Sequence, residues 1–191
     1  MQNAVSEIDA ARHDAITSAG AGFPFLCAFG LAWTAAAALS YAVSPETAAW
    51  IYLLQGGPAV PLAFTIQKLM GYPRASRANP LLPLSLQLLF VQPVAFPVFL
   101  LVLSFSPAYV PVAMASVVGA HFLPYQWLHM TKLYGVLAIA VSAGAYAIAI
   151  LFGEASLHYT GFYVGACLLV GSGFAHAHAR PFLKNLQEAV L

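Results

Sequence analysis

Charged residues are scarce in this chain of 191 residues. Asp, Glu, Lys and Arg make up 7% of it, whereas a soluble domain typically carries about 25%. Seven Lys and Arg against six Asp and Glu give a formal net charge of +1. The chain therefore has neither the basic surface that nucleic acid needs nor an acidic surface for divalent cations. These shortages argue against a nucleic-acid partner and point to the lipid bilayer as the surroundings of the protein.

Several motifs that carry chemistry are absent as well. No acidic residue falls in the middle of a long apolar run, which disfavours carboxylate-coupled ion transport and metalloproteases that need His-Glu-x-x-His. There is no P-loop, no Gly-x-Ser-x-Gly elbow and no Cys-x-x-Cys. The two cysteines, Cys27 and Cys167, lie in different apolar runs at different expected depths, so no disulfide is expected. Nothing in the sequence indicates a cofactor.

Long apolar runs are what the chain has in abundance. It is 61% hydrophobic with a mean hydropathy of +0.81, and crossing a bilayer takes about 20 mostly apolar residues. The links between the runs are short, which predicts antiparallel neighbours. We expect an all-α integral membrane bundle of six transmembrane helices within residues 23–177, at 23–43, 48–70, 81–104, 108–130, 133–152 and 157–177.

The two ends of the chain are predicted to lie outside the bundle. Residues 1–22 form a polar segment in which Ser6 and Asp9 resemble a helix-capping pair. This segment is expected either as a helix on the membrane surface or as a solvated tail. Residues 178–191 are expected to form a C-terminal tail.

The orientation follows from the basic residues, because cytoplasmic loops retain Lys and Arg. In the six-helix arrangement all seven fall on one side, whereas the other side carries Glu46 and Glu154. Both termini are therefore predicted to be cytoplasmic. The basic residues are Arg12, Lys68, Arg74, Arg77, Lys132, Arg180 and Lys184.

Prolines and small residues divide the bundle into two kinds of helix. The three runs within 48–130 contain prolines, each of which frees a backbone carbonyl and tends to kink a helix. The runs at 133–152 and 157–177 contain none and are rich in small residues, such as Gly161 and Gly165. We expect these two helices to pair as a tight hairpin, and such small-residue faces also allow a homo-oligomer.

The helix predicted at 108–130 carries a stripe of polar rings. His121, Tyr125 and His129 are spaced four residues apart and so share one face. Trp127 marks the cytoplasmic interface, which places His121 about 9 Å deeper at 1.5 Å per residue. An ionisable side chain at that depth is a candidate for function, although a neutral histidine satisfied by one neighbour is an equal alternative.

Two amides add to the polar groups expected inside the membrane. Gln87 and Gln92 lie in the proline-rich run at 81–104. Together with His121 and Tyr125 they would line a cytoplasm-facing cavity that binds or passes a small neutral or amphiphilic molecule. The alternative for the glutamines is a structural role as interhelical hydrogen-bond links.

Other functions remain open at this point. An enzyme acting on a lipid or quinone-like substrate would use His121 as acid or base and Tyr125 as proton donor. A structural or accessory membrane subunit would have no small-molecule site. A metal site at His129, His176 and His178 is disfavoured, because residues two apart lie about 200° apart around a helix and cannot easily face one centre.

Three segments resemble a known family. Lys68-Leu69-Met70, Asn79-Pro80-Leu81 and, above all, the segment from Gly119 to Leu128 resemble a family of small bacterial six-helix membrane proteins of unassigned function. The resemblance is strongest over residues 60–135. It implies a multi-pass protein of the bacterial cytoplasmic membrane with His-Phe-x-Pro-Tyr-x-Trp-Leu in its fourth helix, and it implies no activity.

Overall fold

All regular structure in the described part of the chain is helical. The computed structural model describes residues 2–188, with the side chains of all of these except 2–4, 86 and 185–188. Helices suit a bilayer because they pair their backbone polar groups internally. In chain order the elements are α1 (Gln2–Ala19), η1 (Gly20–Gly22), α2 (Phe23–Ser40), α3 (Pro45–Leu54), α4 (Gly56–Leu69), α5 (Leu82–Leu89), α6 (Val91–Val94), α7 (Phe96–Phe105), η2 (Pro107–Tyr109), α8 (Val110–Leu128), α9 (Leu133–Phe152), η3 (Gly153–Ala155) and α10 (Ser156–Glu188).

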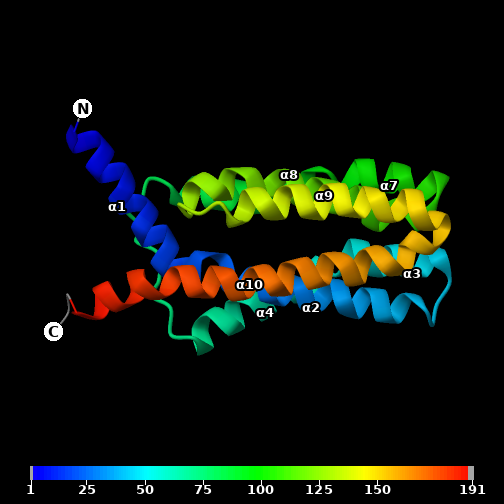
Figure 1. Cartoon of the computed structure of the whole chain (residues 1–191), viewed down its shortest axis with the longest axis horizontal. Coiled ribbons are helices and arrows are strands. Elements are labelled where there is room, and N and C mark those ends of the chain that lie inside the picture. The colour runs from blue at the N-terminus through cyan, green and yellow to red at the C-terminus, as the bar shows by residue number, and fades with distance from the viewer. Residues whose placement is uncertain (1, 189–191) are drawn as a thin grey trace.

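Four helical stretches are long and apolar enough to cross a membrane: Val5–Ser40, Pro45–Leu69, Pro107–Leu128 and Leu133–Lys184. The last of these contains α9 and α10, which run antiparallel on either side of η3 (Figure 1). The run predicted as a single helix at 81–104 is divided into α5, α6 and α7. The predicted all-helical class is confirmed, and the four stretches agree with a membrane protein.

Prolines explain where helices break. Pro58 has no N–H for the carbonyl of Leu54, and α3 ends at that residue before Gly56-Gly57 starts α4. Pro93 and Pro97 similarly accompany the breaks between α5, α6 and α7. By contrast, α8 continues through Pro124, and α9 has no internal break. The irregular helices are thus among those that the sequence marked as irregular.

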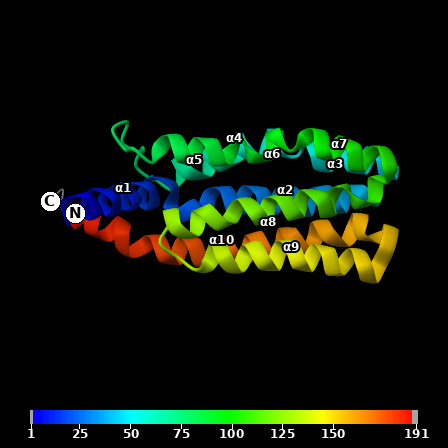
Figure 2. The same cartoon turned by 90° about the horizontal axis from the view of Figure 1, so that it is seen from above.

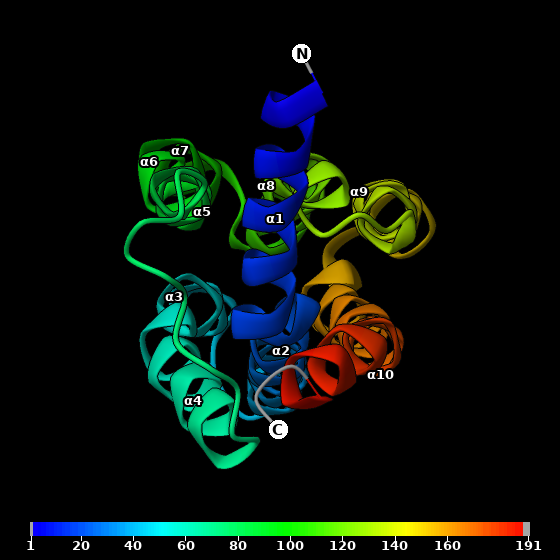
Figure 3. The same ribbon diagram turned by 90° about the vertical axis from the view of Figure 1, so that its left-hand side faces the viewer.

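The helices form two rows when the bundle is seen along its axis. One row holds α5–α7, α8 and α9, and the other holds α3–α4, α2 and α10 (Figure 3). The view from above shows the same pairs one over the other, with α8 near α2 and α9 near α10 (Figure 2). The most extensive packing joins α2 to α10 and α8 to α9.

Small residues hold these pairs together, but not in the pairing that the sequence suggested. A Cβ on Gly161 or Gly165 would meet α2, at Ala37 and Thr34 respectively. A Cβ on Gly119 of α8 would meet Ser142 of α9. The helices predicted at 133–152 and 157–177 do pack against one another as an antiparallel hairpin, but Gly161 and Gly165 face α2. The face of α10 that carries Gly161 and Gly165 is covered by α2, because the lack of side chains at these glycines lets the two backbones approach closely.

The N-terminal segment is a helix packed on the bundle and not a solvated tail. Ile16 of α1 is fully buried, and α1 meets α2 through η1, in which Gly20, Ala21 and Gly22 all have positive φ. At the other end of the chain, the predicted tail from residue 178 continues α10 as helix to Glu188. The α4–α5 link and the α8–α9 turn lie at the end of the bundle that also carries α1 and the last turns of α10 (Figure 1).

Candidate functional site

A cavity of about 1120 Å³ lies between the two rows of helices. Its walls come from α2 and α4 on one side and from α5 to α8 on the other. Ligand pockets typically measure about 300–1,000 Å³, so this cavity is large enough for a ligand of substantial size. The wall is mostly apolar and includes Phe25, Leu26, Phe29, Trp33, Val60, Phe64, Phe90, Phe96, Phe99, Met114, Val118 and Phe122.

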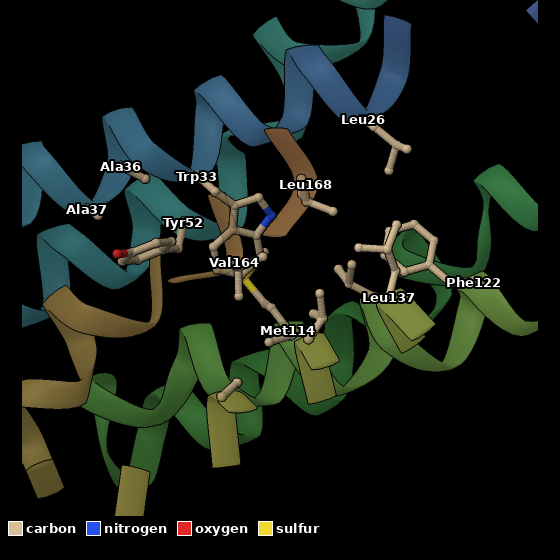
Figure 4. Packing of buried hydrophobic residues seen from close by; sticks show 14 of the residues in the cluster. Leu26, Trp33, Ala36, Ala37, Tyr52, Met114, Phe122, Leu137, Val164 and Leu168 are labelled. Atoms are coloured by element: carbon tan, nitrogen blue, oxygen red, sulfur yellow. The ribbon is translucent and has the colours of Figure 1, made fainter. Parts of the chain in front are cut away.

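The cavity ends near the middle of the bundle. Trp33 of α2 and Met114 of α8 point toward one another across the space between the rows (Figure 4), and both are buried. Beyond them Tyr52 packs on Trp33 with a ring separation of 5.5 Å, and its hydroxyl donates to the carbonyl of Leu157 at 2.9 Å. None of the residues that line the cavity lies beyond this packed layer, so the cavity opens toward one end only.

The open end is polar and is held by hydrogen bonds. The Asn79 amide donates to the carbonyl of Ala11 at 2.9 Å and to the Asp14 carboxylate at 2.7 Å, which ties the α4–α5 link to α1. The Tyr72 hydroxyl is bonded to Nδ1 of His176 at 3.0 Å, which ties the same link to α10. These contacts fix the position of the link beside the cavity.

Two cations line this opening. Lys68 ends α4 and Arg74 lies in the link, and both are exposed. Within the described residues, neither of them forms an ion pair or a side-chain hydrogen bond. The opening thus has two cationic side chains and, at Asp14, one carboxylate that is bonded to Asn79 of the same link.

Two exposed aromatic side chains belong to the cavity wall on the side of α4 and α5–α6. Helix α4 packs mainly on α2, whereas α6 and α7 pack on α8. Phe64 of α4 and Phe90, between α5 and α6, both line the cavity and are 53% and 60% exposed. In a bilayer, exposed aromatic side chains on this side would face lipid chains.

Gln55 is a buried residue in the wall at the apolar depth of the cavity. It lies at the break between α3 and α4 and is only 7% exposed. Neither Nε2 nor Oε1 of its side chain has a hydrogen-bond partner. Leaving such a group unpaired in an apolar interior costs about 1–3 kcal/mol, and buried polar groups without partners are rare in native proteins. Both atoms are enclosed by protein and have almost no exposed surface, so the amide does not face the open space of the cavity.

The residues predicted to contact a ligand are brought together only in part. His121, Tyr125 and Gln92 line the cavity, whereas Gln87 is exposed and does not. Nδ1 of His121 donates to the carbonyl of Val118 at 2.8 Å, which leaves Nε2 as the nitrogen that can accept a proton. Leu82, Ser85 and Leu89 form the face of α5 that lines the cavity, and Gln87 lies on another face of the same helix. Ligand contact by the other three stays a prediction.

His129 lies at a junction of four helices, just after the stretch Pro107–Leu128 ends. Its ring is 3% exposed and stacks on Tyr125 at 5.6 Å. His178 of α10 donates through Nε2 to the His129 carbonyl at 2.9 Å, and Arg12 of α1 donates to the carbonyl of Trp127 at 2.6 Å. Burial, with a smaller effect of His178, lowers the pKa of His129 to about 3. The imidazole is therefore neutral at physiological pH.

The three histidines named as metal candidates do not converge. His176 is bonded to Tyr72, whereas His178 reaches the His129 backbone and not its ring. No group of three or more His, Cys, Asp or Glu that could hold a metal was found in the part of the chain that the structure describes. The different directions of His176 and His178 follow from their spacing of two residues on one helix.

Gln55, Lys68 and Arg74 were missed as site residues by reasoning from the sequence. In the sequence, Lys68 and Arg74 were used only to predict which side of the membrane is cytoplasmic. Gln55 did leave a signal, because a single amide in an apolar run directly before Gly56-Gly57-Pro58 marks a polar side chain at a helix break.

Comparison with known proteins agrees with the resemblance noted in the sequence. No curated protein and no solved structure matches the chain. Residues 8–178 match the model of a family described as a family of unknown function, DUF7010, and the chain therefore belongs to that family.

Proposed function

We propose that this protein is a multi-pass protein of the bacterial cytoplasmic membrane that binds a small amphiphilic molecule in its cavity. Six passes would be formed by α2, α3–α4, α5–α7, α8, α9 and α10, with both termini in the cytoplasm. The positive-inside rule supports this orientation, because all seven Lys and Arg belong to segments predicted on one side. The cavity would then open toward the cytoplasm.

The observation that carries the proposal is a large apolar cavity whose wall also contains a few polar side chains. A cavity of about 1120 Å³ with a mostly apolar wall favours an apolar occupant. The side chains of His121 and Gln92, which line the cavity, favour an occupant that also has polar atoms. The packed layer at Trp33 supports binding or one-sided release over an open channel.

A comparison of two histidine substitutions tests the proposal. His121 lines the cavity, whereas His158 lies near the opposite end, bonded to Ser40 Oγ at 2.6 Å and stacked on Tyr41. We expect a bacterial lipid extract to raise the thermal stability of the purified protein. His121→Ala should reduce that increase more than His158→Ala does, and equal reductions would contradict binding in the cavity.

A second candidate is an enzyme acting on a lipid or quinone-like substrate. The bond from His121 Nδ1 to the Val118 carbonyl favours it, because it leaves Nε2 free to act as a base. Tyr125 packs edge-on against His121 at 5.5 Å and would be the proton donor. Turnover of a lipid by the purified protein, lost in His121→Ala, would favour this candidate over simple binding.

A further inference from the structure

We infer that the cavity binds a single-chain amphiphile with an anionic head group. Lys68 and Arg74 hold the head group at the open end, and the acyl chain extends through the cavity to the closed end at Trp33. This inference rests on the proposed function and specifies the chemical class of the ligand.

The cavity wall carries charge of one sign. Lys68 and Arg74 line it, and no Asp or Glu of the described residues does. Asp14 lies beside the opening but outside the wall, and its carboxylate accepts hydrogen bonds from the Asn79 amide at 2.7 Å and from the Ser76 backbone N–H at 3.2 Å. Arginine and lysine bind carboxylates and phosphates through charge-assisted hydrogen bonds. An anionic head group is therefore favoured over a neutral or cationic one.

The positive-inside rule alone does not account for the position of these two cations. The rule explains why Lys and Arg gather on one side of a membrane protein, but not which surface they join on that side. Arg77 of the same link and Lys132, between α8 and α9, are also exposed and do not line the cavity. Lys68 and Arg74 differ from them because they border an apolar space that can hold a hydrocarbon chain.

The depth of the cavity matches the length of an acyl chain. Gly22, before the start of α2, and Trp33, at the closed end, both line the cavity. Trp33 follows Gly22 by eleven residues, and at 1.5 Å per residue this is about 16 Å of helix. One leaflet of a bilayer core, which lipid chains fill, is about 15 Å thick, half of the full core. Leu26 and Phe29, on the same stretch of α2, line the path with apolar side chains.

The way into the cavity favours one acyl chain over two. The cavity opens at the end that carries the α4–α5 link and is closed by the packed layer at Trp33 and Met114. A ligand that enters at the open end has to leave the bilayer. A single acyl chain holds a molecule to a bilayer only weakly and reversibly, whereas two chains anchor it stably. A single-chain amphiphile can therefore exchange between the bilayer and the cavity.

Binding of four defined probes to the purified full-length protein tests this inference. The probes are hexadecanoate, hexadecyl phosphate, hexadecanol and dihexadecyl phosphate. At low ionic strength we expect the tighter-binding of the two single-chain anions to bind about fivefold more tightly than hexadecanol, as for two exposed ion pairs. Hexadecyl phosphate should bind more tightly than its two-chain counterpart. Tighter binding of hexadecyl phosphate than of hexadecanoate would identify a phosphate head group, and the reverse order a carboxylate.

Two double variants assign the preference for anions to the cavity wall. Lys68→Gln with Arg74→Gln should abolish it. Arg77→Gln with Lys132→Gln is the matched control, because it removes the same number of exposed positive charges outside the wall and should keep the preference. Comparing the variants in the same micelles cancels the partition of each probe into the detergent.

Fluorescence quenching tests where the acyl chain lies. Trp50→Phe with Trp127→Phe removes two exposed rings and leaves Trp33 as the only tryptophan. Bromine quenches tryptophan fluorescence only at close range. Hexadecanoate brominated at its last carbon should therefore quench Trp33 more strongly than hexadecanoate brominated beside its carboxylate.

Several results would overturn the inference. They are binding of hexadecanol as tight as that of both single-chain anions, an equal loss of preference in the two double variants, and binding of dihexadecyl phosphate as tight as that of hexadecyl phosphate. Equal quenching by the two brominated probes would do the same. If no probe binds although a bacterial lipid extract stabilises the protein, the inference fails and the proposed function stands. If the extract also fails to stabilise the protein, both are refuted.

Discussion

Replacing Gly22 by alanine should destabilise the protein strongly, because this glycine closes the bend at which α1 and α2 meet beside the cavity. Its φ is +85°, a conformation that costs an alanine about 1–2 kcal/mol. A Cβ at this position would also overlap the hydroxyl of Tyr134. That hydroxyl donates to the carbonyl of Ala21 at 2.6 Å, and losing a buried hydrogen bond costs about 1–3 kcal/mol. Together these effects predict a loss of about 3 kcal/mol in the free energy of unfolding.

An unfolding titration in mixed micelles measures this loss, and a double variant separates its two causes. Tyr134→Phe removes the hydroxyl that the new Cβ would meet, so Gly22→Ala with Tyr134→Phe should cost less than the sum of the two single changes. Gly173→Ala is the matched control, because a Cβ there meets nothing within 4 Å and alanine favours a helix over glycine. Strict additivity, or a cost of Gly22→Ala no larger than that of Gly173→Ala, would refute the packing described at this bend.

Two further predictions concern pH and the cavity wall. Burial lowers the pKa of His129 to about 3, so the unfolded chain, in which its pKa is about 6.5, binds more protons as pH falls. The stability due to the neutral ring is complete above pH 6.5 and should be lower by about 2 kcal/mol at pH 5. Unfolding titrations of the wild type and of His129→Asn at several pH values measure this loss. The same pH dependence of the free energy of unfolding in both proteins would contradict the prediction. In the wall, Gln92→Leu should weaken retention of a bound lipid by the purified protein, whereas Gln87→Leu should not, and the opposite order would place the ligand outside the cavity.

Composition was sufficient for the class of protein. The scarcity of charge indicated a membrane protein, and the seven Lys and Arg marked one side of it. The prolines of 48–130 correctly indicated irregular helices, because a missing N–H is a local property that any fold must accommodate.

Which helices pack against each other could not be predicted from composition and spacing. Gly161 and Gly165 reveal a face that permits close approach, but not which helix approaches it, and the structure places α2 there. Helical periodicity gives the composition of each face, whereas the partner of a face is decided by the packing of the whole bundle.

The candidate site was predicted only in part for a related reason. His121, Tyr125 and Gln92 were found because polar side chains stand out in apolar runs, and all three line the cavity. Gln87 was included by the same argument, but it lies on a different face of α5 from Leu82, Ser85 and Leu89, which line the cavity. Gln55 was overlooked because its importance depends on the absence of a partner, which only the packed structure reveals.

Mass spectrometry of the small molecules retained by the purified protein tests the central claim most directly. Val60 lines the cavity, and Val60→Trp would fill part of it, whereas Val136 is exposed on α9 and Val136→Trp serves as the matched control. We predict that the wild type and Val136→Trp retain the same amphiphile in comparable amounts and that Val60→Trp loses it. Retention of the same molecule in equal amounts by Val60→Trp would contradict the claim that this cavity is the binding site.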